Sequence, residues 1–232
     1  MTIMLQATGL SKRFVMHHQN HVQLPVFAEV DLTVERGEAV ILSGPSGVGK
    51  SSLLRILYGN YRPSQGHVFV RHGDEMIDIV TATPRRVLDI RRTSMSFVSQ
   101  FLRVIPRVST LDIVKDPMLA RGWDDATATA RAQGMLTRLN LPERLWPLAP
   151  ATFSGGEQQR VNIARSFADP APIMLLDEPT ASLDAANRDV VVDLIRDARR
   201  QGAAIVGIFH DEAVRERIAT RYLNLTHYKA AA

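Results

Sequence analysis

Residues 44–51 read Gly44-Pro45-Ser46-Gly47-Val48-Gly49-Lys50-Ser51 and match the pattern G-x-x-x-x-G-K-[ST], which wraps a phosphate chain. They follow the short apolar run 38–43, and residues 52–57 repeat apolar side chains at helical spacing. In this strand–loop–helix context the glycines let successive backbone N–H groups point at phosphate oxygens. Lys50 is expected to reach the β- and γ-phosphates, and Ser51 is expected to bind Mg²⁺. The stretch therefore predicts a nucleotide site.

Length and composition place bounds on the protein that carries this loop. The chain has 232 residues, enough for one domain with a substantial core, and its lack of cysteine excludes disulfides and thiolate metal sites. The first residues lack the regions of a signal peptide, and no run approaches the roughly 18 apolar residues that span a bilayer. We therefore expect a cytoplasmic protein without direct membrane insertion. The net charge of +4 is too small to indicate nucleic acid as a partner.

Two segments before the phosphate loop alternate apolar and polar residues and predict strands. Apolar and polar side chains alternate over residues 2–7 and 30–35, a period of two. Residues 67–70 and 76–80 flank residues 71–75 and predict an antiparallel hairpin with a longer loop. An antiparallel sheet is therefore expected beside the nucleotide core.

The second half of the chain predicts a helical insertion followed by a return to strands and helices. Prolines punctuate short helical stretches over approximately residues 101–153, which we interpret as an inserted helical subdomain. After it come an apolar strand at 173–176, a helix with its apolar face at 191–198, and a buried strand at 203–209. This alternation predicts an α/β fold with a mainly parallel sheet covered on both faces, within a single domain spanning residues 1–232.

Two carboxylates, Asp177 and Glu178, directly follow the apolar strand at 173–176. The carboxyl ends of strands in open α/β sheets are where ligands bind. Asp177 is predicted to hold Mg²⁺, and Glu178 is predicted to orient or deprotonate the water that attacks the γ-phosphate. Alone, such a pair is more often a structural turn, but the phosphate loop favours the functional interpretation.

A second helix start, at residues 153–160, combines a cap with two glycines. Ser154 is a natural N-cap, and Glu157 three residues later completes a capping box. A simple helix start does not explain Gly155 and Gly156, which lower helix propensity unless something approaches the backbone closely. This N-terminus therefore predicts a second phosphate-binding device.

With these motifs in this order, the sequence resembles the ATP-binding-cassette (ABC) family over essentially the whole chain. Residues 44–51 are similar to the Walker A loop of the family, and Gln100 to its Q-loop glutamine. Residues 153–158 are similar to the signature, and Asp177 and Glu178 match Walker B. Residues 182–184 are similar to the D-loop, and His210 to the switch histidine.

The resemblance implies a P-loop NTPase of the ABC type, with ATP and Mg²⁺ as cofactors. It implies a head-to-tail dimer, of two identical chains or with a related ABC subunit, that holds two ATP molecules between its subunits. Ser154 and Gly156 of one subunit would grip the γ-phosphate held by Lys50 of the other. Glu178, Gln100 and His210 would be the catalytic residues, the last two sensing that phosphate and the attacking water. The metal ligands implied are Ser51, Gln100 and Asp177, and the nucleotide-binding residues implied are Phe14, Gly44, Pro45, Ser46, Gly47, Val48, Gly49, Lys50, Ser51, Ser52, Ser154, Gly155, Gly156 and Glu157.

The sequence departs from the family pattern in two places, the signature and the adenine-stacking residue. The signature has Phe153 and Glu157 where the family commonly has Leu and Gln, a difference that affects only fine tuning. The aromatic residue that stacks on adenine is usually Tyr, and the matching residue here is Phe14. The face of a Phe ring can stack as well, but a ring near the N-terminus could equally belong to the core.

Several stretches resemble, more narrowly, the ATP-binding L subunits of the bacterial carbon–phosphorus lyase pathway. These stretches are residues 10–14, 72–75, 99–107, 136–140 and 207–214. This resemblance implies a cytoplasmic complex with other carbon–phosphorus lyase subunits, acting in the formation of ribose 1-methylphosphonate 5-triphosphate from ATP and methylphosphonate.

A different class stays open, the cytoplasmic ATPase motor of an ABC exporter of the lipoprotein-release or macrolide type. In that case residues 101–117 would receive a helix from a permease, although packing within the helical subdomain explains their apolar side chains equally well. A DNA-repair ATPase of the same superfamily would need long heptad helices between the Walker motifs, and the sequence has none. The arginines at 85–86 and 91–92 indicate a solvated helix face, so nucleic acid is not expected as a partner.

Overall fold

The computed structural model of the chain describes residues 2–16, 22–99 and 106–229. Its centre is a parallel sheet in the order β6-β7-β8-β3-β9. The strands are β3 (Ala39–Ser43), β6 (Met95–Val98), β7 (Ile173–Asp177), β8 (Ala204–Ile208) and β9 (Arg221–Asn224). The predicted parallel sheet is thus confirmed, and two short strands that the sequence patterns did not identify, β6 and β9, form its edges.

An antiparallel sheet in the order β2-β1-β4-β5 stands beside the parallel one. Its strands are β1 (Ile3–Met16), β2 (Val22–Glu35), β4 (Gln65–His72) and β5 (Glu75–Asp78). The alternating segments at 2–7 and 30–35 are only one end of a much longer β1–β2 pair. The longer loop expected between β4 and β5 is wrong, because His72 pairs with Glu75 and leaves a two-residue turn. Gly73, at φ +61°, supplies the left-handed conformation that such a turn needs.

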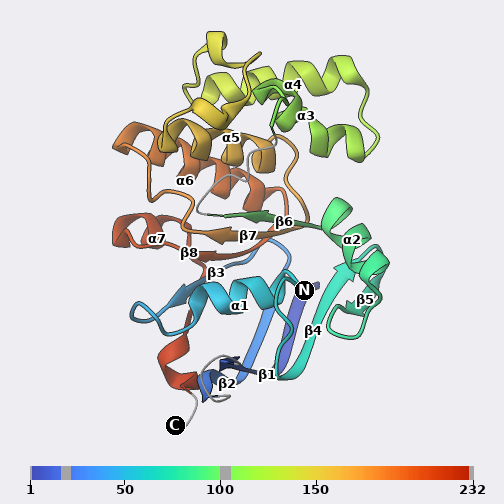
Figure 1. Cartoon of the computed structure of the whole chain (residues 1–232), viewed down its shortest axis with the longest axis vertical. Coiled ribbons are helices and arrows are strands. Elements are labelled where there is room, and N and C mark those ends of the chain that lie inside the picture. Colours follow the sequence, from blue (N-terminus) through green and yellow to red (C-terminus); the bar gives the residue numbers. More distant parts are fainter. Residues whose placement is uncertain (1, 17–21, 100–105, 230–232) are drawn as a thin grey trace.

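Helices cover both faces of the parallel sheet, as the sequence predicted. They are α1 (Lys50–Leu57), α2 (Pro84–Thr93), α3 (Thr110–Ala120), α4 (Asp125–Arg138), α5 (Gly155–Phe167), α6 (Ala185–Arg200) and α7 (Glu212–Ile218), with short 3-10 turns at Glu143–Leu145, Pro150–Thr152 and Leu225–Tyr228. Figure 1 shows α1 between the parallel sheet and the antiparallel strands, with α5 and α6 on the opposite side of the sheet.

Strand β7 illustrates why its sequence is a continuous apolar run. Met174 and Leu176 pack into one core with α5 and α6, whereas Ile173 and Leu175 pack into a second core with α1 and the antiparallel sheet. Because both faces of the strand are covered, no position is left for a polar side chain until Asp177 at its end. The core thereby places the two carboxylates of residues 177 and 178 at the carboxyl edge of the sheet.

Helices α3 and α4 form the end of the molecule opposite to the β1–β2 pair (Figure 1). The predicted apolar face of this region is confirmed, since Ala132, Met135, Leu136 and Leu139 are all buried in the core shared with α5. No helix within the described ranges is both long and apolar enough to cross a bilayer.

Candidate active site

The phosphate loop joins the end of β3 to the start of α1, and its glycines determine its path. Gly44, Gly47 and Gly49 have φ angles of +131°, +80° and +102°, which L side chains rarely adopt. A Cβ atom on Gly49 would also lie 2.5 Å from Cγ1 of Val26. The loop can therefore keep this curl only with glycine at position 49, which explains the fixed residue type of the motif.

A cavity of about 340 Å³ lies over this loop. Its described lining residues are Phe14, Val26, Ser46, Gly47, Gly49, Lys50, Ser51, Ser52, Glu178 and His210. The fold thus brings together half of the predicted nucleotide-binding residues with two predicted catalytic residues from distant parts of the chain. Gly44, Pro45 and Val48 shape the loop but do not line the cavity, and Gln100 lies outside the described residues.

Lys50 occupies the centre of the curled loop. Its Nζ donates hydrogen bonds to the carbonyl oxygens of Gly44 and Pro45, at 2.7 and 2.9 Å. Burial lowers the pKa of the ammonium, an effect that the Glu178 carboxylate opposes and the Arg215 guanidinium assists. The ammonium is positioned beside the space where the loop N–H groups would receive phosphate oxygens.

Ser51, which lines the cavity, forms an oxygen pair with the buried residue Asp177. The Ser51 hydroxyl donates to Oδ1 of Asp177 at 3.0 Å, and the Asp177 residue is only 6% exposed. Burial raises the pKa of this carboxyl group; the hydrogen bond from Ser51 works against the rise, and the charge of Glu178 adds to it. A desolvated carboxylate beside a hydroxyl offers the hard oxygen ligands that Mg²⁺ prefers, so these residues fit the predicted metal.

Glu178 and His210 contact each other directly. Nε2 of His210 lies 2.6 Å from Oε1 of Glu178, and both residues line the cavity. Glu178 has a left-handed backbone with φ +53°, which is uncommon for a residue with a side chain and is often found at functional sites. Glu178 directly follows β7, and His210 lies two residues after the end of β8, so the contact links the ends of these two strands. Their proximity is what the catalytic assignment of both residues requires.

The signature segment is organised by its own capping box. The Ser154 hydroxyl donates to Oε2 of Glu157 at 2.7 Å, and the backbone N–H of Ser154 donates to the same oxygen at 2.9 Å. These bonds, led by that from the side-chain hydroxyl, lower the pKa of Glu157. None of residues 154–157 lines the cavity over the phosphate loop of the same chain. The signature and the phosphate loop therefore belong to separate surfaces of one subunit.

Phe14 is half-buried and lines the cavity, so the alternative that it belongs to the core is wrong. Its ring contacts the Tyr61 ring edge-on, with centroids 5.8 Å apart. Nζ of Lys12 lies 4.7 Å from the Phe14 centroid and donates to the carbonyl of Arg62 at 2.9 Å. Lys12, Tyr61 and the cavity residue Val26 carry no sequence motif, and only long-range pairing could have identified them.

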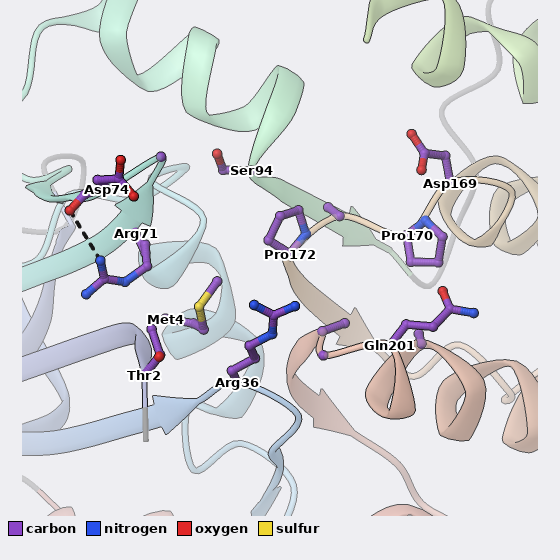
Figure 2. Close-up of a pocket in the computed structure, with 15 residues that line it drawn as sticks. Thr2, Met4, Arg36, Arg71, Asp74, Ser94, Asp169, Pro170, Pro172 and Gln201 are labelled. Carbon is purple, nitrogen blue, oxygen red and sulfur yellow. Dashed lines mark hydrogen bonds between the residues drawn. The ribbon is translucent and has the colours of Figure 1, made fainter. Parts of the chain in front are cut away.

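A second hollow, of about 520 Å³, lies at the opposite edge of the parallel sheet. It is lined by residues that precede the strands, among them Arg36, Ser94 and Pro172. Figure 2 shows the Arg71 guanidinium directed to the carbonyl of Asp74, a hydrogen bond of 3.3 Å, rather than into open space. None of the predicted site residues lies there, so the active-site assignment stays with the carboxyl edge of the sheet.

Comparison with known protein families agrees with this geometry. A family model described as "ABC transporter" matches residues 27–181, more than half of the chain. The chain belongs to the ABC transporter family. The ATPase domains of this family bind ATP with Mg²⁺, as the phosphate loop and the pair of Ser51 and Asp177 had predicted.

Related proteins, some with solved structures, are similar to this ABC ATPase over almost its whole length. The lipoprotein-releasing system ATP-binding protein LolD of Shewanella sp. (strain MR-4) is 37% identical over 217 residues, which are 93% of this chain and 90% of LolD. The macrolide export ATP-binding/permease protein MacB of Pectobacterium atrosepticum is 34% identical over 97% of this chain, which spans only 33% of MacB. The dimeric structure of the cassette MJ0796 with ADP and Pi superposes with a TM-score of 0.84, at 29% identity and over 97% of this chain and 94% of that one.

These comparisons confirm the predicted ABC-type P-loop fold with its antiparallel sheet. They do not confirm the narrower resemblance to the carbon–phosphorus lyase subunit, because the relatives reported above carry the names of exporter ATPases. The choice of partner is therefore a matter for proposal.

Proposed function

We propose that this chain is the ATP-hydrolysing subunit of a larger complex and that it closes as a head-to-tail dimer around two MgATP molecules. One observation carries the proposal: the cavity holds the phosphate loop, Glu178 and His210, whereas Ser154 and Gly155 are exposed elsewhere on the same chain. A second copy, or a related ABC subunit, would supply the missing helix N-terminus. The similar cassette MJ0796 has been solved as a dimer with ADP and Pi, which supports this arrangement.

In the proposed reaction, the phosphate-loop N–H groups and Lys50 hold the triphosphate. Ser51 and Asp177 would hold Mg²⁺, which when bound would supply positive charge that offsets the charge of the phosphates. Glu178 orients a water molecule, whose oxygen attacks the γ-phosphorus while the bond to the bridging oxygen of ADP breaks. Glu178 accepts the proton that the water loses, and His210, 2.6 Å away, fixes the carboxylate in place. The products are ADP and inorganic phosphate.

The test combines hydrolysis with assembly. The Glu178→Gln variant keeps the shape of the side chain and removes the base, so we expect it to bind ATP and elute as a stable dimer in gel filtration. Wild-type protein should show only a transient dimer under the same conditions. Undiminished turnover by Glu178→Gln, or a monomeric elution with ATP present, would reject the proposed role.

The partner has two candidates, and the first is the permease of an exporter. The names of the relatives LolD and MacB support it and favour it over the second candidate. A cleft of about 200 Å³ between β6, α3 and α5, lined by Phe97, Pro117 and Arg165 among others, offers space for a segment of the partner to dock. In this case hydrolysis would drive the movement of a substrate across a membrane.

The second candidate is the carbon–phosphorus lyase system, in which this subunit would act in forming ribose 1-methylphosphonate 5-triphosphate. The resemblance of residues 10–14, 72–75 and 207–214, together with 99–107 and 136–140, supports it. The partners would then be other carbon–phosphorus lyase subunits, and the transfer chemistry would take place on one of them.

One experiment separates these candidates. The tagged protein is purified from cells grown on a phosphonate as the phosphorus source, with membranes solubilised in detergent, and its partners are identified. Recovery of carbon–phosphorus lyase subunits supports the second candidate, whereas recovery of an integral membrane permease supports the first. The Glu178→Gln variant, loaded with ATP, serves as the matched sample in which a nucleotide-dependent complex should accumulate.

A further inference from the structure

A buried amide on α5 links three segments of the proposed active site. Gln159 is only 2% exposed. Its Nε2 donates to the carbonyl oxygen of Pro179 at 3.1 Å and to that of Ser99 at 3.4 Å. Because both partners are acceptors, only the nitrogen end of the amide can face them, and its two hydrogens suffice for both bonds.

The positions of these partners give the contact its meaning. Gln159 lies on the second turn of the helix that begins with the signature residues Ser154 and Gly156. Pro179 directly follows Glu178. Ser99 directly follows the last residue of β6 and precedes Gln100. The contact therefore joins the segment that would meet the partner's phosphate to the segments that carry the proposed base and the Q-loop glutamine.

The two carbonyl groups are held to different degrees. Asn162, on the next turn of α5, also donates to the Ser99 carbonyl, at 2.8 Å. Within the described ranges, Gln159 is the donor recorded for the Pro179 carbonyl, and no second one is. The backbone of Glu178 is held on its own side, by its N–H to the carbonyl of Ile208 at 3.1 Å and by the N–H of Ala181 to its carbonyl at 3.3 Å. Pro179 has no N–H, so its carbonyl bond to Gln159 is the contact that ties this residue to α5. Loss of the Gln159 amide would release the Pro179 carbonyl, whereas loss of the Asn162 amide would leave that carbonyl in place.

We propose that Gln159 is a positioning residue that couples the signature helix to the catalytic carboxylate. Contact of the signature with the γ-phosphate on the opposite subunit fixes α5, and Gln159 passes that constraint through the Pro179 carbonyl to Glu178. The left-handed backbone of Glu178 makes the direction of its carboxylate sensitive to the next peptide. The inference rests on the proposed function, because it needs the dimer and the role of Glu178 as base.

The first test removes the donor and keeps the volume of the side chain. Gln159→Met should lower kcat for ATP hydrolysis about tenfold, as expected for the loss of a buried hydrogen bond that orients a catalytic group. KM for ATP and the ATP-induced dimer measured in the Glu178→Gln background should stay within about twofold, because the nucleotide contacts are intact. Asn162→Leu, the matched control, should keep kcat within about twofold, since it loses only a bond to Ser99.

The second test measures how kcat depends on pH, a dependence that a purely structural role of Gln159 would not change. In Gln159→Glu, a protonated carboxyl group can still donate a hydrogen bond to the Pro179 carbonyl, whereas the ionised form faces two carbonyl oxygens and repels them. The ratio of its kcat to that of the wild type should therefore rise as the pH falls. The same ratio for Gln159→Met should not change with pH.

The outcomes separate this inference from the proposed function. If the wild type hydrolyses ATP and Glu178→Gln forms the dimer, but Gln159→Met turns over at the wild-type rate, the coupling role is overturned and the proposed function stands. An equal loss in Asn162→Leu also overturns it, because the effect would then pass through Ser99. If the wild type neither hydrolyses ATP nor dimerises, the proposed function itself fails. Should Gln159→Met prove unfolded by its thermal transition, the pH ratio of Gln159→Glu decides, and a flat ratio overturns the inference.

Discussion

Asp177 provides the sharpest test of the proposed metal site, because the charge that would bind the metal should cost the folded protein stability. The residue is 6% exposed, and the hydrogen bond from Ser51 offsets only part of its desolvation. Its pKa is therefore raised in the folded chain above the ordinary 3.8. A carboxyl group with a raised folded pKa costs stability at pH values above that pKa, and the cost disappears below the ordinary value. Asp177→Asn removes the charge at nearly constant volume and keeps an acceptor for Ser51.

We expect Asp177→Asn to raise the stability of the nucleotide-free protein by about 1 kcal/mol, a typical gain from a single stabilising substitution. For a chain of 232 residues this corresponds to a rise in Tm of roughly 2–4 °C. The gain should be present at neutral pH and absent near the ordinary pKa of aspartate. In the wild type, MgATP should raise Tm by more than ATP with a chelator, and in the variant this difference should vanish.

The assay is thermal unfolding followed by fluorescence or calorimetry, with and without MgATP, at both pH values. Asp184→Asn is the control: hydrogen bonds, first that from the backbone of Asn187, lower the pKa of Asp184, so its ionised form favours the fold. This variant should show no rise in Tm at neutral pH. A lower Tm for nucleotide-free Asp177→Asn at neutral pH, or an undiminished MgATP effect on it, would refute the reasoning.

Four further predictions concern single residues. Lys50→Ala should abolish ATP binding or hydrolysis, measured by calorimetry and phosphate release. Gly49→Ala should lower Tm and nucleotide affinity together, because its Cβ would lie 2.5 Å from Val26 in a backbone at φ +102°. Phe14→Ala should raise KM for ATP about tenfold with kcat nearly unchanged, whereas Phe14→Tyr should restore the wild-type KM. For Glu157, whose pKa is lowered by the Ser154 hydrogen bonds, the stabilisation present above the ordinary carboxyl pKa should be lost as the pH falls through the folded pKa, and Glu157→Ala should flatten this part of the pH–Tm profile.

Local sequence patterns predicted those parts of the molecule whose physics is local. The phosphate loop needs glycines within a few residues, the strand before Asp177 needs an apolar run, and the cap at Ser154 needs Glu157 three residues later; all three are confirmed. The same patterns failed where pairing between distant segments decides. The edge strands β6 and β9 have four residues each, and β9 has only one buried side chain, so neither carries a strong period of its own.

The candidate site shows the same division. Val26 lines the cavity, and Lys12 contacts the ring of the cavity residue Phe14, because of the pairing of the long strands β1 and β2. No short window of sequence determines that register. Gln159 looks like one more polar residue of a helix until the fold places the Pro179 carbonyl against it. The turn between β4 and β5 was misjudged because Gly73 and Asp74 alone close it, and the flanking residues Arg71, His72 and Glu75 look like loop residues although they belong to the strands.

The arrangement of charge explains why ATP, and not ADP, should close the proposed dimer. The N-terminus of α5 carries the partial positive charge of a helix end, yet its first turn also holds the Glu157 carboxylate, which accepts both bonds from Ser154. On the opposite side of the proposed interface, Glu178 lines the cavity and Asp177 lies buried next to it in the chain. Two surfaces that carry carboxylates repel each other. They can approach when a group lies between them whose anionic side faces α5 and whose other side is neutralised by cations. A γ-phosphate held by Lys50 and Mg²⁺ would have this character, and ADP lacks that group. Loss of the γ-phosphate would therefore leave the carboxylates facing each other, so hydrolysis itself would drive the dimer open.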